Sequence, residues 1–479
     1  MKDKFEFLEM KDRKKILLLC DDIRAHSGIA HMAREIVINT AHHYNWFNIG
    51  ARLSDPDRGR TFDLSKDIAK IAGIEEADVK VHVNEGYGDP GMLRSAIRQI
   101  EPDAIMIFTD PRYWIWLFEI EREVRSKIPL FYLNIWDNYP APLYNKQYYK
   151  SCDLLMAISK QTLNINKIVL GDDAEDKVLK YVPHGVSDKT FFPITEEDEN
   201  YEKFSEFRNN IFNGKDYDFV ALWNSRNVSR KQPADVLLSF KYFCDKLPED
   251  KAAKCALIMH TNPVDNNGTD LLAVKKDLLG EDYNVFFSNK PLLPEQMNLL
   301  YNLSDVVMLI SSNEGWGLSI TEGVMTGRMV VGNVTGGIQD QFRFEDENGN
   351  WIDFDEDFPT NHNGTYTKHG EWAMPVFPAG RKIIGSPLTP YIFDDVCDSR
   401  NVAEALEKVY DIPKKERLAR GMKGRMWMQS EEASMTNFRM GTKVIQAFEE
   451  AFDKYVPRES YEIIKVEDVD KETVTHNLD

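Results

Sequence analysis

The sequence has few cysteines and no long apolar run. Its five cysteines are scattered through 479 residues without a CxxC pair, so neither a disulfide framework nor a zinc-binding spacing is indicated. No apolar run approaches the roughly 18 residues of a membrane-spanning helix. The first residues, Met1-Lys-Asp-Lys-Phe, lack the apolar core of a signal peptide. We therefore expect a soluble protein of the reducing cytoplasm.

Positive charge is also scarce. Lys and Arg number 59 against 78 Asp and Glu, a formal net charge of −19, which disfavours sequence-independent binding to polyanions. The segment 413–427 is a local exception, with six basic residues and one acidic residue. It is interpreted either as a phosphate-contacting surface or as a solvated helix face.

Strand and helix patterns alternate along the chain, as a parallel α/β sheet requires. The length is too great for one core and suits two domains. Apolar runs predict strands at 14–20, 79–83, 103–109, 130–135, 154–158, 180–182, 219–223, 256–260, 285–288, 305–311 and 329–334. The expected organisation is an N-terminal domain over 1–194, a polar linker over 195–218, a C-terminal domain over 219–440 with an irregular insertion at about 342–400, and a C-terminal helix and tail over 441–479.

Two acidic residues follow the predicted strand at 305–311. Glu314 lies in a turn with Gly315 and Gly317, and Glu322 lies within the helix expected to begin near residue 318. Carboxylates accept paired hydrogen bonds from vicinal hydroxyls, and backbone N–H groups at a glycine turn can approach a ligand closely. The segment therefore suits a nucleotide sugar, although solvated surface charges are the alternative.

Two cations follow the strand at 219–223. Arg226 and Lys231 lie in a polar loop ahead of a helix that begins at Pro233, a residue suited to a first helical turn. Cations in this position can clamp a diphosphate and stabilise its charge as it leaves. The alternative is a basic surface loop.

With this Arg-x4-Lys loop and Glu-x7-Glu segment, the chain resembles retaining glycosyltransferases of family 4, which have the GT-B fold. The segment 181–193 resembles the family's inter-domain segment, and the likeness covers about 14–340 and the helices after 400. The run 22–28 also resembles glycosyltransferases of tailed phages. The resemblance implies two Rossmann-like, doubly wound domains facing a cleft, a nucleotide-sugar donor expected to be a UDP-sugar, and no metal or other cofactor.

The resemblance also implies roles for individual residues. Counterparts of Arg226 and Lys231 hold the diphosphate, Glu314 lies beside the donor sugar, and Glu322 binds the ribose. A glycine at the first strand-to-helix turn, Gly28, is expected to let substrate approach the backbone. The full donor-binding set implied is Gly28, Arg226, Lys231, Glu314, Gly315, Trp316, Gly317, Leu318 and Glu322.

The N-terminal domain is expected to hold the acceptor. The segment 131–142 has Trp136 where the family often has His, but it keeps Asp137. Asp137 is therefore the candidate for orienting the acceptor hydroxyl, and a structural turn carboxylate is the alternative. Catalytic candidates are thus Asp137, Arg226, Lys231 and Glu314, and acceptor-binding candidates are Trp114, Trp116, Asp137 and Tyr139.

The identity of the acceptor stays open at this point. The phage-like run makes 5-hydroxymethylcytosine in DNA one alternative, and a saccharide or lipid-linked acceptor is the other. A GT-B nucleotide-sugar epimerase or a binding protein without transfer activity is a further alternative. An acidic stretch at 353–357 invites a metal interpretation, and Asp346, Asn348 and Asn350 begin like a calcium loop, but Trp351 lies where that loop needs glycine. No metal site is expected. The sequence does not specify an oligomeric state.

Overall fold

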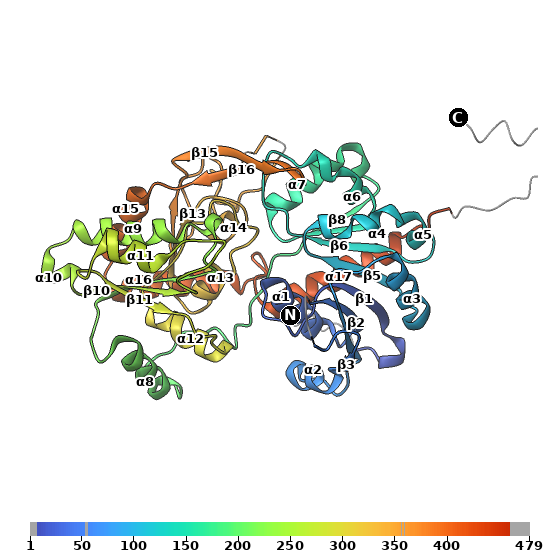
Figure 1. Cartoon of the computed structure of the whole chain (residues 1–479), viewed down its shortest axis with the longest axis horizontal. Coiled ribbons are helices and arrows are strands. Elements are labelled where there is room, and N and C mark those ends of the chain that lie inside the picture. Colours follow the sequence, from blue (N-terminus) through green and yellow to red (C-terminus); the bar gives the residue numbers. More distant parts are fainter. Residues whose placement is uncertain (1–6, 53–55, 356, 359, 460–479) are drawn as a thin grey trace, which may run out of the picture.

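The protein is described by a computed structural model that places residues 7–52, 56–355, 357–358 and 360–459. Two α/β halves lie side by side, each with a sheet flanked by helices (Figure 1). The first sheet has the strand order β3-β4-β2-β1-β5-β6-β7-β8, parallel except for β3. Its strands are β1 (Lys14–Asp21), β2 (Tyr44–Ala51), β3 (Thr61–Asp63), β4 (Val79–Asn84), β5 (Ala104–Phe108), β6 (Leu130–Asn134), β7 (Leu154–Ala157) and β8 (Val178–Tyr181).

The second sheet is parallel throughout, in the order β11-β10-β9-β12-β13-β14. Central strands of both sheets are buried on both faces, as parallel sheets covered by helices require. A separate antiparallel hairpin, β15–β16, follows. The strands are β9 (Phe219–Asn224), β10 (Cys255–His260), β11 (Asn284–Ser288), β12 (Val306–Leu309), β13 (Met329–Asn333), β14 (Ala373–Val376), β15 (Gly380–Ser386) and β16 (Thr389–Val396).

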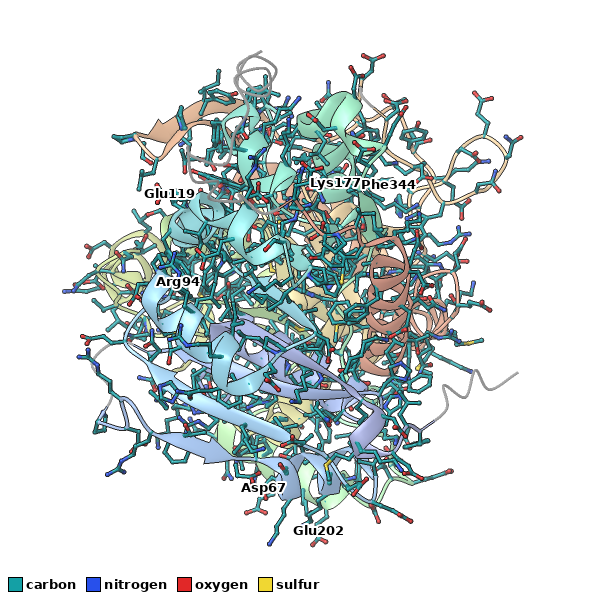
Figure 2. The ribbon with its side chains drawn as sticks, turned by 90° about the vertical axis from the view of Figure 1, so that its right-hand side faces the viewer. Asp67, Arg94, Glu119, Lys177, Glu202 and Phe344 are labelled. Carbon is teal, nitrogen blue, oxygen red and sulfur yellow. The ribbon has the colours of Figure 1, made fainter. Side chains whose placement is uncertain are left out.

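Amphipathic helices cover the sheets. Asp67 on α2 and Glu202 on α8 are exposed and point outward (Figure 2), whereas Ile68 beside Asp67 is buried. The helices of the first half are α1 (Gly28–Thr40), α2 (Ser65–Ala72), α3 (Pro90–Ile100), α4 (Ile115–Glu119), α5 (Glu121–Arg125), α6 (Lys146–Lys150) and α7 (Lys160–Leu170). Those that follow are α8 (Tyr201–Phe212), α9 (Pro233–Asp245), α10 (Glu249–Ala252), α11 (Leu271–Val274), α12 (Pro294–Leu303), α13 (Leu318–Met325), α14 (Ile338–Phe342), α15 (Ser399–Tyr410), α16 (Lys414–Met428) and α17 (Asn437–Lys454).

Strand order reverses once near the middle of each sheet. In the first half β1 pairs with both β2 and β5, and in the second β9 pairs with both β10 and β12. Connections on the two sides of such a point run in opposite directions, which opens a crevice outside the carboxyl ends of the strands. The loops after β1, β5, β9 and β12 therefore surround the expected ligand sites.

The structure differs from the sequence expectation in several segments. The region expected to be a polar linker contains α8, whose Phe204, Phe207 and Phe212 pack against the main core. The expected irregular insertion supplies an edge strand, β14, and the β15–β16 hairpin. The sequence pattern did not indicate these elements, because their segments are rich in prolines and charged residues. Contacts with neighbouring elements, rather than a local apolar pattern, stabilise them.

The C-terminal helix returns to the first half. Phe448 on α17 packs against Tyr44, Trp46 and Phe131 of the first sheet. Tyr455 beyond the helix donates a hydrogen bond to the Arg125 carbonyl at 2.6 Å. The chain thus crosses between the halves a second time, and residues 460–479 of the expected tail lie outside the described residues.

Candidate active site

A cavity of about 730 Å³ lies between the two halves. The first half contributes the start of α1 and residues that follow β6, β7 and β8. The second half contributes the loops after β9 and β12 and the first turns of α13. These are the carboxyl ends of parallel strands, where ligands bind in open α/β sheets.

A buried ion pair joins the two predicted segments of the second half. Lys231 Nζ contacts Glu314 Oε2, with side-chain exposures of 12% and 10%. Burial opposes ionisation of Glu314, but the Lys231 and Arg230 cations outweigh it and place its pKa below the ordinary value. Burial lowers the pKa of Lys231, partly opposed by Glu314. The loops after β9 and β12 therefore meet through opposite charges.

Close backbone packing fixes the turn that carries Glu314. Gly336 has φ +50°, and a Cβ there would lie 1.9 Å from the Glu314 carbonyl oxygen. Gly317 has φ +89°, a left-handed conformation that favours glycine, and it caps the start of α13. The glycines thus hold Glu314 and the first amides of α13 at the cavity.

Two arginines extend the positive charge. Arg226, as expected, lines the cavity, but its side chain is 66% exposed and pairs with Asp265 at 3.2 Å. Arg230, which the sequence interpretation did not select, also lines it and lies 3.7 Å from Glu314 Oε2. Its Nη1 donates to the Asn313 carbonyl at 3.0 Å. Its position next to Lys231 was the only sequence signal, and that signal does not distinguish it from a surface arginine.

Glu322 lies deeper along α13. It accepts a hydrogen bond from the Tyr301 hydroxyl, and that hydroxyl accepts one from Asn224 Nδ2 at 2.8 Å. Burial raises the pKa of Glu322 to about 7, although the Tyr301 hydrogen bond acts in the opposite direction. Glu322 is thus a half-buried carboxyl group with remaining hydrogen-bond acceptor capacity toward the cavity.

Asp137 faces these groups from the first half. Asp137 lines the cavity and lies close to Gly315: a Cβ added to Gly315 would be 3.9 Å from the Asp137 Cβ. Burial raises the pKa of Asp137 to about 6; Arg230 favours its ionisation, and Glu314 opposes it. Asp137 and Glu314 therefore belong to one electrostatic cluster across the cleft.

His184 is a cavity residue to which the sequence interpretation gave no role. It is 6% exposed, and its Nδ1 is buried without a hydrogen-bond partner. Its ring meets Phe108 and Trp316 edge to face, with centroids 6.0 and 6.2 Å apart. Burial lowers the pKa of His184 to about 3, so the imidazole is neutral at pH 7.

Gly28 begins α1 at the cavity wall, with Ser27 as its N-cap. A Cβ at Gly28 would meet no protein atom within 4 Å, so packing does not require glycine there. Leu318 and Trp316 line the opposite wall. The Trp316 indole N–H donates a hydrogen bond to the Thr321 hydroxyl at 2.9 Å.

The aromatic acceptor candidates do not line the cavity. Trp114 is 1% exposed within the core of the first half, where Trp116 also packs. Tyr139 is 7% exposed, and its hydroxyl accepts a hydrogen bond from Asn164 at 2.7 Å. The acceptor interpretation of Trp114 and Tyr139 is therefore corrected, because both are buried in the core. Trp116 is half-buried against that core, and its acceptor role stays a prediction.

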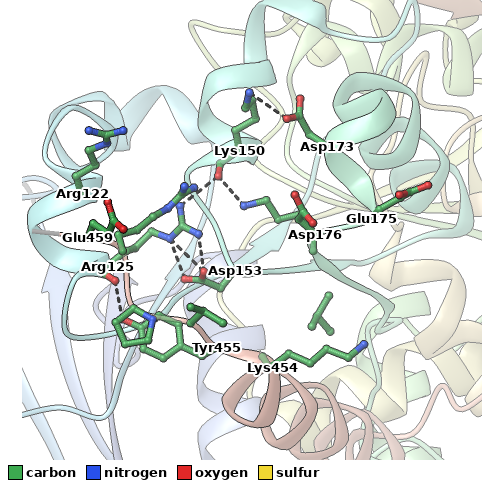
Figure 3. Close-up of a pocket in the computed structure, with 16 residues that line it drawn as sticks. Arg122, Arg125, Lys150, Asp153, Asp173, Glu175, Asp176, Lys454, Tyr455 and Glu459 are labelled. Atoms are coloured by element: carbon green, nitrogen blue, oxygen red, sulfur yellow. Dashed lines mark hydrogen bonds and ion pairs between the residues drawn. The ribbon is translucent and has the colours of Figure 1, made fainter. Parts of the chain in front are cut away.

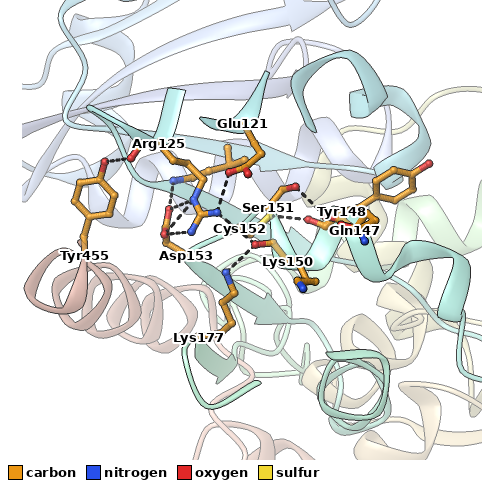
Figure 4. A network of polar contacts seen from close by, with 11 residues as sticks. Glu121, Arg125, Gln147, Tyr148, Lys150, Ser151, Cys152, Asp153, Lys177 and Tyr455 are labelled. Carbon is orange, nitrogen blue, oxygen red and sulfur yellow. Dashed lines mark hydrogen bonds and ion pairs between the residues drawn. The ribbon is translucent and has the colours of Figure 1, made fainter. Parts of the chain in front are cut away.

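A second cavity, of about 900 Å³, opens at the amino ends of β7 and β8 (Figure 3). It is lined by charged side chains that largely bind one another: Arg125 pairs with Asp153 and Glu121, and Lys150 with Asp173. Lys177 donates to the Lys150 carbonyl at 2.7 Å (Figure 4). The network anchors the segment after α17, because the Arg125 carbonyl accepts hydrogen bonds from the Tyr455 hydroxyl and the Arg458 amide.

Two further features bear on the sequence expectations. Among the described residues, no group of three or more His, Cys, Asp or Glu side chains is arranged to hold a metal ion. Asp353, in the acidic stretch, pairs instead with Lys160 at 3.2 Å. Within the described part of the chain, no helix combines the length and apolar character needed to cross a membrane.

Comparison of sequences gives limited matches. No protein-family model matches the chain. Trehalose synthase of Pyrococcus horikoshii is 28% identical over 120 residues, which are 24% of this chain and 28% of that protein.

Comparison of structures gives matches over nearly the whole chain. Anabaena HepE in complex with UDP and glucose has a TM-score of 0.61 at 14% identity, covering 91% of this chain and 100% of that one. Sucrose-phosphate synthase of Thermosynechococcus elongatus has a TM-score of 0.63 at 13% identity, covering 92% and 100%. The UDP-forming α,α-trehalose-phosphate synthase of Burkholderia vietnamiensis has a TM-score of 0.61 at 12% identity, covering 92% and 98%. The expectation of a GT-B fold is confirmed.

Proposed function

We propose that this protein is a retaining glycosyltransferase of family 4 that moves a sugar from a UDP-sugar to an acceptor hydroxyl. The observation that carries the proposal is the meeting of Lys231, Glu314 and Glu322 with Asp137 around one cavity built by both halves. Neighbours of the same fold with UDP or UDP-glucose bound support uridine as the nucleoside.

In the proposed binding mode the donor lies along the second-half side of the cavity. The Glu322 carboxylate accepts hydrogen bonds from the two ribose hydroxyls. Lys231, Arg226 and Arg230 then face the diphosphate. The planar guanidinium groups of the two arginines are suited to binding phosphate oxygens. The sugar comes next to Glu314 and the amides at the N-terminus of α13, where partial positive charge favours electron-rich groups.

In the reaction, the bond between the anomeric carbon and the diphosphate oxygen breaks and UDP leaves. Lys231 and the arginines stabilise the negative charge that builds on the departing oxygen. The acceptor oxygen bonds to the anomeric carbon on the same face, and its proton passes to that departing oxygen. Retaining glycosidases instead use a carboxylate nucleophile, whereas Glu314 is committed to Lys231 here. The product keeps the anomeric configuration of the donor.

Asp137 orients the acceptor. Its pKa of about 6 leaves the carboxylate ionised at pH 7, so it can accept a hydrogen bond from the attacking hydroxyl. His184 presents a neutral imidazole to the same cavity. The first half thus supplies orientation, and the second half supplies the charge that drives departure of the diphosphate.

We infer that no metal ion is required, because Lys231, Arg226 and Arg230 supply the charge that would neutralise the diphosphate. Activity should persist after dialysis against EDTA. The five cysteines, all free and buried, support a reducing compartment such as the cytoplasm.

The test is NMR of the product formed from a nucleotide sugar of known anomeric configuration. Retention is expected, and inversion would contradict the mechanism. Change of the nucleotide sugar itself without any acceptor would indicate an epimerase. Nucleotide binding without turnover against a broad set of acceptors would indicate a binding protein.

A further inference from the structure

An aromatic pair stands at the carboxyl edge of the first sheet. Tyr87, in the loop after β4, stacks on Tyr113, in the turn after β5, with ring centroids 4.4 Å apart and an interplanar angle of 27°. Tyr113 is 51% exposed. Tyr87 thus covers one ring face, and about half of the Tyr113 surface stays accessible to a ligand.

A single carboxylate links this pair to the cavity. Asp21, at the end of β1, accepts a hydrogen bond from the Tyr87 hydroxyl at 2.7 Å and one from the Ser27 hydroxyl at 2.5 Å. Ser27 lines the cavity between the halves. The chain of contacts from Ser27 through Asp21 and Tyr87 to Tyr113 therefore continues the cavity wall outward.

The sheet topology explains why these residues meet. Strands β1 and β5 are neighbours at the point where strand order reverses, so the loops after them diverge and leave a crevice. Asp21 ends β1, and Tyr113 lies in the turn that follows β5. The pair thus flanks the crevice of the first half.

We propose that Tyr113, backed by Tyr87 and Asp21, is the acceptor subsite, and that the acceptor is a neutral saccharide. The inference rests on the proposed glycosyl transfer and adds its acceptor class. The negative face of an aromatic ring attracts the C–H face of a sugar ring. Each carboxylate oxygen has two lone pairs, so Asp21 can also accept hydrogen bonds from sugar hydroxyls.

Local charge favours a neutral acceptor over a nucleic acid. Duplex DNA is held mainly by cations that contact phosphates. Arginines around this crevice are already paired: Arg112 with Asp110, Arg24 with Asp22, and Arg58 with Glu85. The net charge of −19 acts in the same direction.

The experiment combines a donor assay with an acceptor assay. Thermal shift with UDP-, GDP- and ADP-sugars identifies the donor. Transfer of its labelled sugar is then measured to neutral mono- and disaccharides and to a duplex that contains 5-hydroxymethylcytosine. Wild type is compared with Tyr113→Ala, with Tyr113→Phe, which keeps the ring, and with Phe438→Ala, a control at an aromatic side chain 58% exposed on α17.

We expect transfer to a saccharide. Tyr113→Ala should raise the acceptor KM on the order of 10-fold, the scale of one lost aromatic contact, with unchanged donor affinity. Phe438→Ala should behave as wild type, whereas Tyr113→Phe should recover most of the acceptor affinity lost in Tyr113→Ala, because it keeps the aromatic ring. An unchanged KM in Tyr113→Ala, or transfer to the duplex alone, would overturn the subsite. Donor binding without transfer to any saccharide would overturn it and leave the donor site intact, whereas no donor binding would refute the proposed function itself.

Discussion

Lys231 and Glu314 form a buried ion pair between the loop after β9 and the turn after β12, with side-chain exposures of 12% and 10%. A buried pair contributes little net stability, but removal of one partner leaves an unpaired buried charge. The pair therefore fixes the position of each group more than it stabilises the fold. In the proposed reaction it holds a cation and a carboxylate together at the cavity where the bond breaks.

Lys231→Ala should lower turnover on the order of 10²–10³-fold, because one stabiliser of the departing diphosphate is lost. It should also destabilise the fold by about 3 kcal/mol, since Glu314 remains buried without its partner. Steady-state kinetics and chemical denaturation measure the two effects.

The double variant Lys231→Met with Glu314→Gln separates the effect of Lys231 on turnover from its effect on stability. It should recover most of the lost stability, because no buried charge is left unpaired, but turnover should stay low. Lys246→Ala, at an exposed lysine paired with Glu407, is the matched control. Recovery of turnover along with stability would show that Lys231 has only a structural role.

Glu322 should make UDP affinity depend on pH. Its pKa of about 7 means that the carboxylate, the better acceptor for ribose hydroxyls, is lost as the pH falls through 7. Affinity for UDP should therefore fall between pH 8 and pH 6 in the wild type and change less in Glu322→Gln. Calorimetric titration of UDP across this range measures the effect, and identical profiles would remove Glu322 from the donor site.

Gly28→Ala should impair donor use without destabilising the fold. A Cβ there meets no protein atom within 4 Å, so the melting temperature should be unchanged, whereas the methyl group enters the cavity. Gly380→Ala, where a Cβ also meets nothing within 4 Å, is the control. Wild-type kinetics in Gly28→Ala would indicate that substrate does not approach this turn.

Asp340 should make stability fall as the pH rises. It accepts hydrogen bonds from the Lys160 amide at 2.9 Å and the Tyr181 hydroxyl at 3.0 Å, and burial raises its pKa from 3.8 to about 7. The protonated carboxyl stabilises the fold fully below 3.8, and this stabilisation is lost as the pH rises through about 7. Melting temperatures of wild type and Asp340→Asn between pH 5 and pH 8 should diverge at the basic end. Parallel curves would contradict this account of Asp340.

The sequence was most informative where burial is complete. Continuous apolar runs predicted β9 and β12, because both faces of a central parallel strand are covered. The strand β2 was missed since Asn45 and Asn48 interrupt its apolar pattern. Both are buried and hydrogen-bonded, Asn48 Nδ2 to the Leu18 carbonyl at 3.2 Å. Tertiary hydrogen bonds of this kind leave no local signal.

Part of the site could be predicted because its residues directly follow the strands that the apolar runs indicate. Loops after strands indicated Lys231, Glu314 and Glu322, and the structure brings them together at one cavity. Arg230 and His184 were missed, because only the closed fold shows which polar residues face the cleft. Conversely, aromatic composition alone could not distinguish the core residue Trp114 from the exposed Tyr113 beside it.

The central claim is that one activated sugar nucleotide binds where the two halves meet. A crystal structure of the protein with UDP tests it most directly. The account predicts ribose hydroxyls within hydrogen-bond distance of Glu322 and diphosphate oxygens within reach of Lys231 and the neighbouring arginines. UDP bound in the cavity beside Arg125 and Lys177, or bound with these groups uncontacted, would contradict it.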